Sequence, residues 1–592
     1  MATLPGSTGM NRIQRLARNV RAAVHYRPTQ ILHRIVNRAR RRLTDLAPAR
    51  ARRRVADAAG GASAATGLTC PEALRAYALD PAISPPERAE DLLEERFTFI
   101  GETREVGAHP DWYWRDSPAP SHLWRINQHY HRFVVDAAVG ALRSPSTSDR
   151  LLERAASLLD HWSASCRPGG RASWDSAWNS YAVSTRVLNA WLARRLLIGI
   201  PGRPAEELRS RLDVLAAESA AFVSRWIEWD LGGNHLLRNV TALVAAGHWL
   251  VGNAAREWRE RGRRLLLAEL RRQVLEDGLH EERSPMYHAL LLEDLLVVGF
   301  ASPGSGTWDT ALQEQAARLL RALATVVHPD EEIALFNDSA LGIAAPPETL
   351  SRLASGFDVP PPAAPGDLPA AGYYRFADGG DALVVDAGLL GPDHLPAHAH
   401  CDALSFEYSA SGERLVVDSG VDRYEAGPER DFQRSTAAHS TLQVSDLEQG
   451  EPFGSFRMGR RPRVRGHRID ELNIEGEHDG FGARRTHRRR VRWDGTAGFS
   501  WVDVVDGPDD VPVTVRVGLA PGASAHLEGT AAARVARGES RFRLESPSRG
   551  GLEIAEGVYC ERFGRSTTRT VLTWRGTGGH GQELPFSLTR VG

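Results

Sequence analysis

The chain contains no lysine, so all 73 of its basic residues are arginines. This absence excludes Schiff-base catalysis and the lysine of a P-loop, and it leaves planar guanidinium groups suited to carboxylate or sulfate. Cysteine is also scarce, and no CxxC pair occurs among Cys70, Cys166, Cys401 and Cys560. The sequence therefore indicates no disulfide framework.

Long hydrophobic runs are also missing. No stretch of about 18 uncharged apolar residues occurs, so we expect no membrane span. Residues 1–10 lack the apolar core of a secretory signal, and we expect a location that is cytoplasmic or peripheral to a membrane. The formal net charge of -1 gives no overall attraction to nucleic acid, and we expect no nucleic-acid partner. Nothing in the composition indicates an oligomeric state.

Residues 1–69 are interpreted as a basic N-terminal arm, because arginine is dense over 11–54. A break is expected at Pro28, and before it apolar residues recur at helical spacing, at Ile13, Leu16, Val20 and Val24. This pattern is typical of an amphipathic segment on an anionic membrane surface or on a partner. The alternative is an arm that packs on the body and exposes a basic face to solvent.

Residues 70–358 have a predominantly helical pattern. Apolar residues recur every three or four positions, with short Gly/Pro breaks, in runs such as 151–165, 181–198, 206–229 and 235–250. Antiparallel helix pairs of this kind can curl into a solenoid or an (α/α) toroid with a cleft. Tryptophan is dense here; helix packing explains most of these residues, and Trp178 is a candidate for stacking on a sugar ring.

A proline-rich stretch over 359–371 breaks the helical period and is interpreted as a linker. From residue 372 to 592 the apolar runs are short, rich in Val, Tyr, Phe and Thr, and interrupted by Gly and Asp. This pattern predicts an antiparallel β-sandwich for the rest of the chain.

The first candidate site is the stretch His398-Ala-His400. In a strand, residues i and i+2 share a face, so one imidazole can bind a metal while the other transfers protons. Asp418 ends the next apolar run and His439 follows a third segment, and a His, Asp and His set suits zinc. The alternative is that these are surface or hydrogen-bonded histidines on a polar sheet face.

Two further clusters each open a predicted helix, Asn234-His235 and the stretch from Glu282 to His288. If they meet the histidine motif, Asn234 can hydrogen-bond a carboxylate and neutralise the charge of a developing enolate. Tyr287 and His398 can then move protons, and a nearby arginine such as Arg283 would ease the ionisation of Tyr287. Singly, each of these residues is more commonly a helix cap or a packed ring.

Together these motifs, with Val417 to Gly420 and Arg434 to His439, resemble the heparinase II/III family of polysaccharide lyases over roughly 124–444. The resemblance implies an alginate-lyase-like helical toroid followed by a heparinase II/III-like β-sandwich. It also implies β-elimination on an anionic polysaccharide: abstraction of the C5 proton of a uronic acid and departure of the C4-linked sugar. Glycosaminoglycan-like and alginate-like chains are the expected substrate class.

By the same resemblance, Asn234 and His235 would contact the uronate carboxylate. Tyr287 would be the acid, and also the base for one C5 epimer, with His398 as base for the other. A structural zinc would be held by three residues, His400, Asp418 and His439. The candidates for further substrate contacts are Arg238, Glu282, Arg283, Arg434 and Trp178.

The chain departs from the family pattern at Arg238, where related sequences commonly carry an acidic residue, and at Cys401, which we interpret as a packing residue. The basic arm resembles family members associated with making bacterial exopolysaccharide. A non-catalytic polysaccharide-binding or assembly protein is therefore the second hypothesis. A glycoside hydrolase is the third, but it needs two carboxylates and only Glu282 lies in the motifs.

Overall fold

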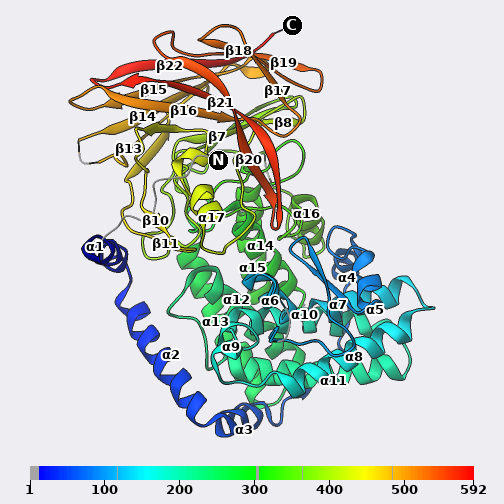
Figure 1. The fold of residues 1–592 in the computed structure, drawn as a ribbon. Coiled ribbons are helices and arrows are strands. Elements are labelled where there is room, and N and C mark those ends of the chain that lie inside the picture. The colour runs from blue at the N-terminus through cyan, green and yellow to red at the C-terminus, as the bar shows by residue number, and fades with distance from the viewer. Residues whose placement is uncertain (1–11, 116–117, 302–305, 363, 483, 592) are drawn as a thin grey trace.

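The computed structural model describes residues 12–115, 118–301, 306–362, 364–482 and 484–591. Figure 1 shows helices in the lower part of the molecule and strands in the upper part, with the N-terminal arm along one side. None of the helices in the described parts is long and apolar enough to cross a bilayer.

The arm consists of three helices, α1 (Arg12–Ala23), α2 (Pro28–Leu46) and α3 (Pro48–Ala59). The predicted break at Pro28 is confirmed, because this proline is the first residue of α2, where its fixed φ and missing N–H cost nothing. A short pair, β1 (Ser63–Ala64) with β4 (Leu250–Val251), joins the end of the arm to the helical part. Predictions for residues 1–11 lie outside the described residues.

The helical part is built from antiparallel helix hairpins. The first helix of each hairpin packs against the first helix of the next, so that an inner and an outer layer form. The inner helices are α7 (Arg132–Arg143), α10 (Ser180–Leu196), α12 (Gly233–Trp249) and α14 (Pro285–Gly299). Their outer partners are α8 (Ser148–Ser165), α11 (Arg203–Val223), α13 (Asn253–Gln273) and α15 (Thr307–Thr325).

Smaller elements complete this half: α4 (Glu72–Leu79), α5 (Glu87–Leu93), β2 (Arg96–Phe99), β3 (Glu102–Glu105), α6 (His122–Gln128), α9 (Arg171–Asp175), η1 (Leu197–Gly199) and α16 (Pro347–Ser355).

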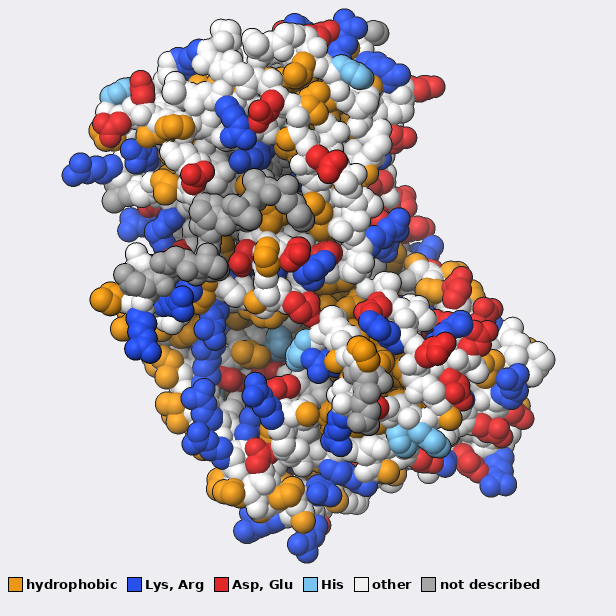
Figure 2. Space-filling model, viewed as in Figure 1, with side chains coloured by type: hydrophobic (Ala, Val, Ile, Leu, Met, Phe, Trp, Pro, Cys, Tyr) orange, Lys and Arg blue, Asp and Glu red, His pale blue; other side chains and the backbone are white. Residues whose placement is uncertain are grey.

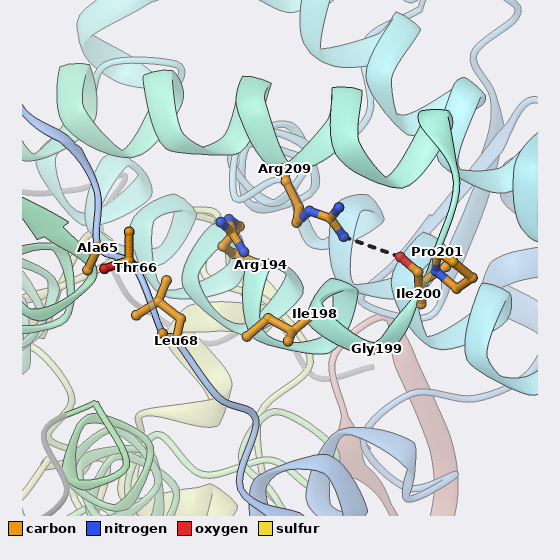
Figure 3. A pocket seen from close by; sticks show the side chains of 10 residues that line it. Ala65, Thr66, Leu68, Arg194, Ile198, Gly199, Ile200, Pro201 and Arg209 are labelled. Atoms are coloured by element: carbon orange, nitrogen blue, oxygen red, sulfur yellow. Dashed lines mark hydrogen bonds between the residues drawn. The ribbon is translucent and has the colours of Figure 1, made fainter.

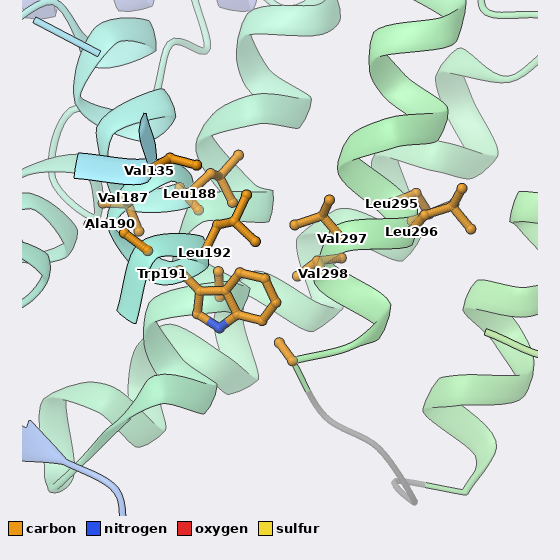
Figure 4. Close-up of a cluster of buried hydrophobic side chains, with 14 of the residues drawn as sticks. Val135, Val187, Leu188, Ala190, Trp191, Leu192, Leu295, Leu296, Val297 and Val298 are labelled. Atoms are coloured by element: carbon orange, nitrogen blue, oxygen red, sulfur yellow. The ribbon is translucent and has the colours of Figure 1, made fainter. Parts of the chain in front are cut away.

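Burial explains the two layers. The inner helix α14 is apolar around most of its circumference, and 13 of its 15 residues are buried. The outer helix α13 buries one narrow stripe, and its arginines are exposed or half-buried. Figure 4 shows buried side chains of α10, including Trp191, and of α14, which belong to one hydrophobic core.

Three of the antiparallel sheets in the described residues have four or more strands. One has the order β5-β6-β7-β8, a second β20-β21-β16-β9, and the third the order β12-β13-β14-β15-β22-β19-β18-β17. The strands of the first two sheets are β5 (Tyr373–Asp378), β6 (Asp381–Asp386), β7 (Ser405–Ala410), β8 (Glu413–Val416), β9 (Leu442–Val444), β16 (Val511–Gly518), β20 (Gly551–Arg562) and β21 (Arg565–Gly578).

The strands of the third sheet are β12 (Val464–Arg468), β13 (Asn473–His478), β14 (Thr486–Trp493), β15 (Gly498–Asp506), β17 (Ser524–Leu527), β18 (Ala532–Arg537), β19 (Ser540–Glu545) and β22 (Gln582–Arg590). Strictly alternating burial along β14 shows why these residues form a half-buried strand. Aromatic rings such as Phe406, Trp501 and Phe586 fill the space between the sheets. The remaining elements are β10 (Pro452–Phe453), β11 (Arg457–Met458), α17 (Pro428–Gln433), η2 (Thr436–Ala438) and η3 (Gly495–Ala497).

The predicted fold class, a helical toroid followed by an antiparallel β-sandwich, is confirmed. The last toroid helix, α16, ends at Ser355, and the first sandwich strand, β5, begins at Tyr373. The described residues between them contain no helix or strand, and the predicted linker over 359–371 falls inside this interval.

Candidate functional site

The histidine motif lies in the loop between β6 and β7, so the prediction that His398 and His400 lie on a strand is wrong. The two rings nevertheless converge, because both donate to one buried carboxylate. His398 Nδ1 is 2.9 Å from Asp338 Oδ2, and His400 Nε2 is 2.8 Å from Asp338 Oδ1. The loop is shaped by backbone contacts to the segment before α16, including Asp338 N to the carbonyl of His398 at 3.0 Å.

Asp338 is held by a buried arginine as well. Arg430 of α17 donates from Nη1 to Asp338 Oδ1 at 2.5 Å and from Nη2 to Oδ2 at 2.8 Å. Burial alone would raise the pKa of Asp338, but Arg430 and the two histidines hold it well below its ordinary value. The carboxylate therefore stays charged, and it fixes Nδ1 of His398 as the protonated nitrogen and Nε2 as the free base.

The free Nε2 of His398 faces residues of the toroid. Asn234 Nδ2 lies 3.4 Å from it, and Glu282 Oε2 lies 3.5 Å from it. The ring of Tyr287 packs against the imidazole with 3.9 Å between centroids. The sandwich thus supplies His398, and the N-termini of α12 and α14 supply the opposite wall, so the predicted convergence of these three residues is found.

Asn234 is positioned by Glu282. Its amide nitrogen lies 3.1 and 2.9 Å from the two oxygens of the carboxylate, and its backbone N–H donates to Glu282 Oε1 at 2.9 Å. Burial opposes the charge on Glu282, but His398, His280 and the Asn234 donors lower its pKa below the ordinary value. Glu282 therefore stays charged and holds the side chain of Asn234 in place. The sequence interpretation gave Glu282 a direct contact with substrate.

The surroundings of Tyr287 also differ from the prediction. Its hydroxyl lies 3.0 Å from that of Tyr424. Burial, with Tyr424, Tyr181 and Asp338 adding to it, raises the pKa of Tyr287 well above its ordinary value. Arg283 does not ease its ionisation, because that guanidinium donates to carbonyl groups instead. Tyr287 is therefore protonated at neutral pH.

His235 lies beside this cluster, and its side chain is about one-third exposed. Its Nδ1 is 3.3 Å from Glu228 Oε2, and its ring packs on Tyr181. Burial favours the neutral ring, yet the Glu228 carboxylate outweighs it and raises the pKa of His235 above its ordinary value. Arg238 continues this wall: it pairs with Asp294 at 2.9 Å and lies over the ring of Tyr181.

A candidate metal centre adjoins the proton-transfer cluster. His400, Asp402 and His439 are buried, and each offers one ligand atom within 4.8 Å of the others. His400 Nδ1, Asp402 Oδ1 and His439 Nε2 have no hydrogen-bond partner among the described residues. A divalent cation bound between these three residues would supply the missing partner of each atom.

The second nitrogen of each histidine is held by a carboxylate, as is usual around a bound metal. His400 Nε2 uses Asp338, and His439 Nδ1 lies 2.6 Å from Asp418 Oδ2. Asp402, rather than the predicted ligand Asp418, lies with His400 and His439 in this group, and Asp418 hydrogen-bonds His439. Burial lowers the pKa of His400 to about 4, so its ring is neutral at physiological pH, as a ligand must be.

Negative charge accumulates at this centre. Asp386, Asp402 and Asp418 are each at most 2% exposed. Burial, reinforced by Asp402, raises the pKa of Asp386 well above its ordinary value, and burial raises that of Asp402 to about 6. A bound cation would relieve both effects, so the residues present fit a zinc ion.

Three residues predicted to bind substrate lie in the protein core instead. Arg283 donates to the carbonyls of 370, 371 and 281, and it joins the toroid to the start of the sandwich. Arg434 donates to the carbonyls of 399, 454 and 455. Trp178 packs on Phe222 and is 5% exposed. Cys401 is also internal, where its sulfur accepts from Gly450 N.

The sequence interpretation missed Asp338, Arg430 and Tyr424. All three are buried or half-buried: Asp338 contacts His398, Tyr424 contacts Tyr287 and His398, and Arg430 pairs with Asp338. Asp338 follows Asn337, whose φ of 56° and whose bonds to the histidine loop mark a tightly built turn. No periodic pattern surrounds these residues, and only the Asn-Asp-Ser sequence at 337–339 was available as a signal.

A separate hollow of about 660 Å³ lies on the toroid, away from the cluster (Figure 3). It is formed between the segment after the arm and the turn that joins α10 to α11, where Arg209 donates to the carbonyl of Ile200. None of the proton-transfer or metal-centre residues line it.

Two family models match the chain. The model described as "Heparinase II/III N-terminus" covers residues 88–354, and "Heparinase II/III-like, C-terminal" covers 360–584. Among curated proteins, "FtsZ-localized protein C" of Caulobacter vibrioides is 26% identical over 569 residues, covering 88% of this chain and 91% of that protein. "Heparin-sulfate lyase" of Pedobacter heparinus is 25% identical over 300 residues, covering 45% of this chain and 44% of the relative.

Solved structures show the same fold. The crystal structure of heparinase III matches with a TM-score of 0.68 and 16% identity, covering 89% of this chain and 86% of that one. A heparan sulfate lyase from Pedobacter heparinus, solved as a mutant, matches with a TM-score of 0.59 and 18% identity, covering 85% and 82%.

Proposed function

The chain belongs to the heparinase II/III-like family, and on that basis we propose that it is a polysaccharide lyase that cleaves uronate-containing chains by β-elimination. The observation that carries this proposal is the meeting of His398 Nε2 with Asn234 and Tyr287 across the junction of toroid and sandwich. These residues supply a base, a carboxylate-binding amide and an acid within one cluster.

In the proposed reaction, His398 Nε2 takes the C5 proton of the uronic acid. The electrons of the C5–H bond form the C4–C5 double bond, the C4–O bond breaks, and the departing sugar oxygen takes the proton of the Tyr287 hydroxyl. The raised pKa of Tyr287 keeps its hydroxyl protonated at neutral pH, which is the state that a proton donor needs before the reaction. For a substrate epimer that presents its C5 proton to Tyr287 instead, the same hydroxyl would have to act as base.

The uronate carboxylate is proposed to lie against Asn234 and His235. An amide nitrogen has two hydrogens, and the Asn234 contact to His398 directs one of them away from Glu282. His235 is favoured in its cationic form by Glu228. Both groups would stabilise the negative charge that develops on the carboxylate as C5 loses its proton.

Glycoside hydrolysis has less support, because it requires one protonated and one charged carboxyl group. The two carboxylates nearest His398 are Glu282 and Asp338, and the pKa of each is lowered. Neither is suited to be a general acid at neutral pH.

We also propose that His400, Asp402 and His439 hold a structural zinc ion. Bound there, zinc would supply no reacting group; it would fix the loop that carries His398 and balance the buried carboxylates. Elemental analysis of purified protein tests this, and a metal-free protein that is fully folded and active would contradict it.

The experiment that tests the lyase is ultraviolet absorbance of the unsaturated uronate product over a panel of glycosaminoglycan and alginate chains. Wild-type protein is compared with Tyr287→Phe and His398→Ala. A rise in absorbance that both substitutions abolish is the expected result. A rise that neither changes would contradict the roles given to these residues.

The second candidate is a non-catalytic polysaccharide-binding or assembly protein. One observation favours it: the relative named for its localisation with FtsZ covers 88% of this chain, about twice the share covered by the named lyase. A folded, zinc-loaded protein that binds a uronate polymer without releasing unsaturated product would establish this alternative. For either candidate we propose an anionic polysaccharide as partner and a location that is cytoplasmic or peripheral to a membrane.

A further inference from the structure

The helices of the N-terminal arm expose hydrophobic side chains to an unusual degree. Among the described residues, nine of the 21 large hydrophobic side chains that are exposed lie between residues 13 and 46. They are Ile13, Leu16, Val20, Val24, Ile31, Leu32, Ile35, Leu43 and Leu46, with exposed fractions from 46% to 82%. Scattered single residues of this kind are ordinary on a protein surface, but such a concentration marks an interaction site.

The exposed residues form stripes. The spacing of 13, 16 and 20 places these residues on one face of α1, and Val24, which follows the helix and donates from its N–H to the carbonyl of Val20, continues this face. In α2, Ile31, Ile35 and Leu46 share a face with Arg38 and Arg42, which are also exposed. Figure 2 shows basic side chains in a column where Figure 1 places α2, with hydrophobic side chains beside it at the outer edge of the molecule.

The opposite side of the arm is firmly seated. Arg21 forms a bidentate ion pair with Glu451 at 2.6 and 2.9 Å, and Arg18 lies over the ring of Phe453. Asn37 donates to Asp230 at 2.8 Å. The arm therefore already contacts the rest of the chain through other residues, and the exposed stripe is not part of that contact.

The charge around the stripe identifies the partner. Residues 12–59 contain 14 arginines and two aspartates. A second copy of the chain would bring two rows of arginine together, which is unfavourable. Nucleic acid would pair with the arginines but leave the apolar stripe in water. A bilayer with anionic headgroups satisfies both, since apolar side chains enter the acyl boundary while guanidinium groups remain at the headgroups.

We propose that the outer face of α1 and α2 docks on an anionic lipid surface. The contacts of the arm also connect this docking to the proton-transfer cluster. The Gln30 side chain lies 3.4 Å from two carbonyl oxygens, that of Leu231 in the toroid and that of His394 in the sandwich. These carbonyls are three and four residues from Asn234 and His398, so docking would hold the segments that precede both residues close to the lipid surface.

The test is flotation with vesicles of phosphatidylcholine alone or mixed equally with phosphatidylglycerol, using the full chain without polysaccharide. Wild-type protein is expected to float with the anionic vesicles only, and less so at high salt. Leu16→Glu combined with Ile35→Glu should lower the vesicle affinity about tenfold or more. Both side chains are 64% exposed, so the melting temperature should not change.

The matched control is Leu527→Glu combined with Ile554→Glu, two sandwich residues that are 45% and 42% exposed. This variant should bind vesicles like wild type. Absence of wild-type binding, or equal loss in the control, would overturn the proposal. If wild type forms dimers that the arm variant does not, and floats with neither vesicle, the stripe serves a second copy instead. Because no substrate is present, none of these outcomes bears on the lyase.

Discussion

Replacing Asp338 with asparagine should separate the structural and chemical roles of this carboxylate. Each of its oxygens accepts one histidine N–H and one arginine N–H: Oδ1 from His400 and Arg430, Oδ2 from His398 and Arg430. Asparagine has the same shape, but only one of its two terminal atoms can accept. Whichever way the amide turns, two of the four hydrogen bonds are lost and a buried arginine loses its counter-charge.

The expected cost in stability follows from this burial. Asp338 and Arg430 are fully buried, and removing one partner of a buried ion pair costs about 3–5 kcal/mol. Activity should fall further. If the amide N–H faces His398, its proton moves to Nε2 and the base is lost, at a cost of about 10²–10⁴-fold in kcat. If it faces His400, the Nδ1 lone pair is lost and zinc content falls.

The chain contains a matched control. Asp503 accepts from His487 and Arg489, is equally buried, and hydrogen-bonds none of the proton-transfer residues or proposed metal ligands. Asp503→Asn should cost similar stability, measured by urea unfolding, while kcat per folded molecule and zinc content stay at wild-type values. If Asp338→Asn loses no more kcat and no more zinc than Asp503→Asn, the role given to Asp338 is wrong.

Three other outcomes are expected. Tyr287→Phe keeps the ring but removes the proton donor, so kcat should fall by about 10²-fold or more with no change in melting temperature, and a wild-type rate would exclude the acid role. Asp402→Ala should abolish zinc retention against a chelator, whereas Asp418→Ala should weaken it about 10–100-fold, and equal losses would contradict the assignment of ligand and supporting residue. Glu228 raises the pKa of His235 and so favours the cation. KM should therefore increase as pH rises through that pKa, and Glu228→Gln should move the increase to lower pH. A KM that is constant with pH would exclude His235 from carboxylate binding.

The sequence by itself determined the architecture, and it identified most residues of the proton-transfer cluster that we propose. Helical periodicity is a local property, and it predicted the runs that became α8, α10, α11 and α12, although α11 ends at Val223 rather than near Trp229. The motif residues Asn234, Tyr287 and His398 were found because each lies at an element end or in a distinctive stretch.

Only the tertiary structure decided how those groups are supported. His398 and Asn234 are 164 residues apart, and the Asp338 that fixes the tautomer of His398 lies 60 residues away in a turn without periodicity. The choice of Asp402 over Asp418 as the ligand depends on which carboxylate oxygen has no partner, and the burial of Arg283 depends on which carbonyls it meets. Hydrogen-bond partners are set by the packing of distant segments, and no local pattern in the chain encodes that packing.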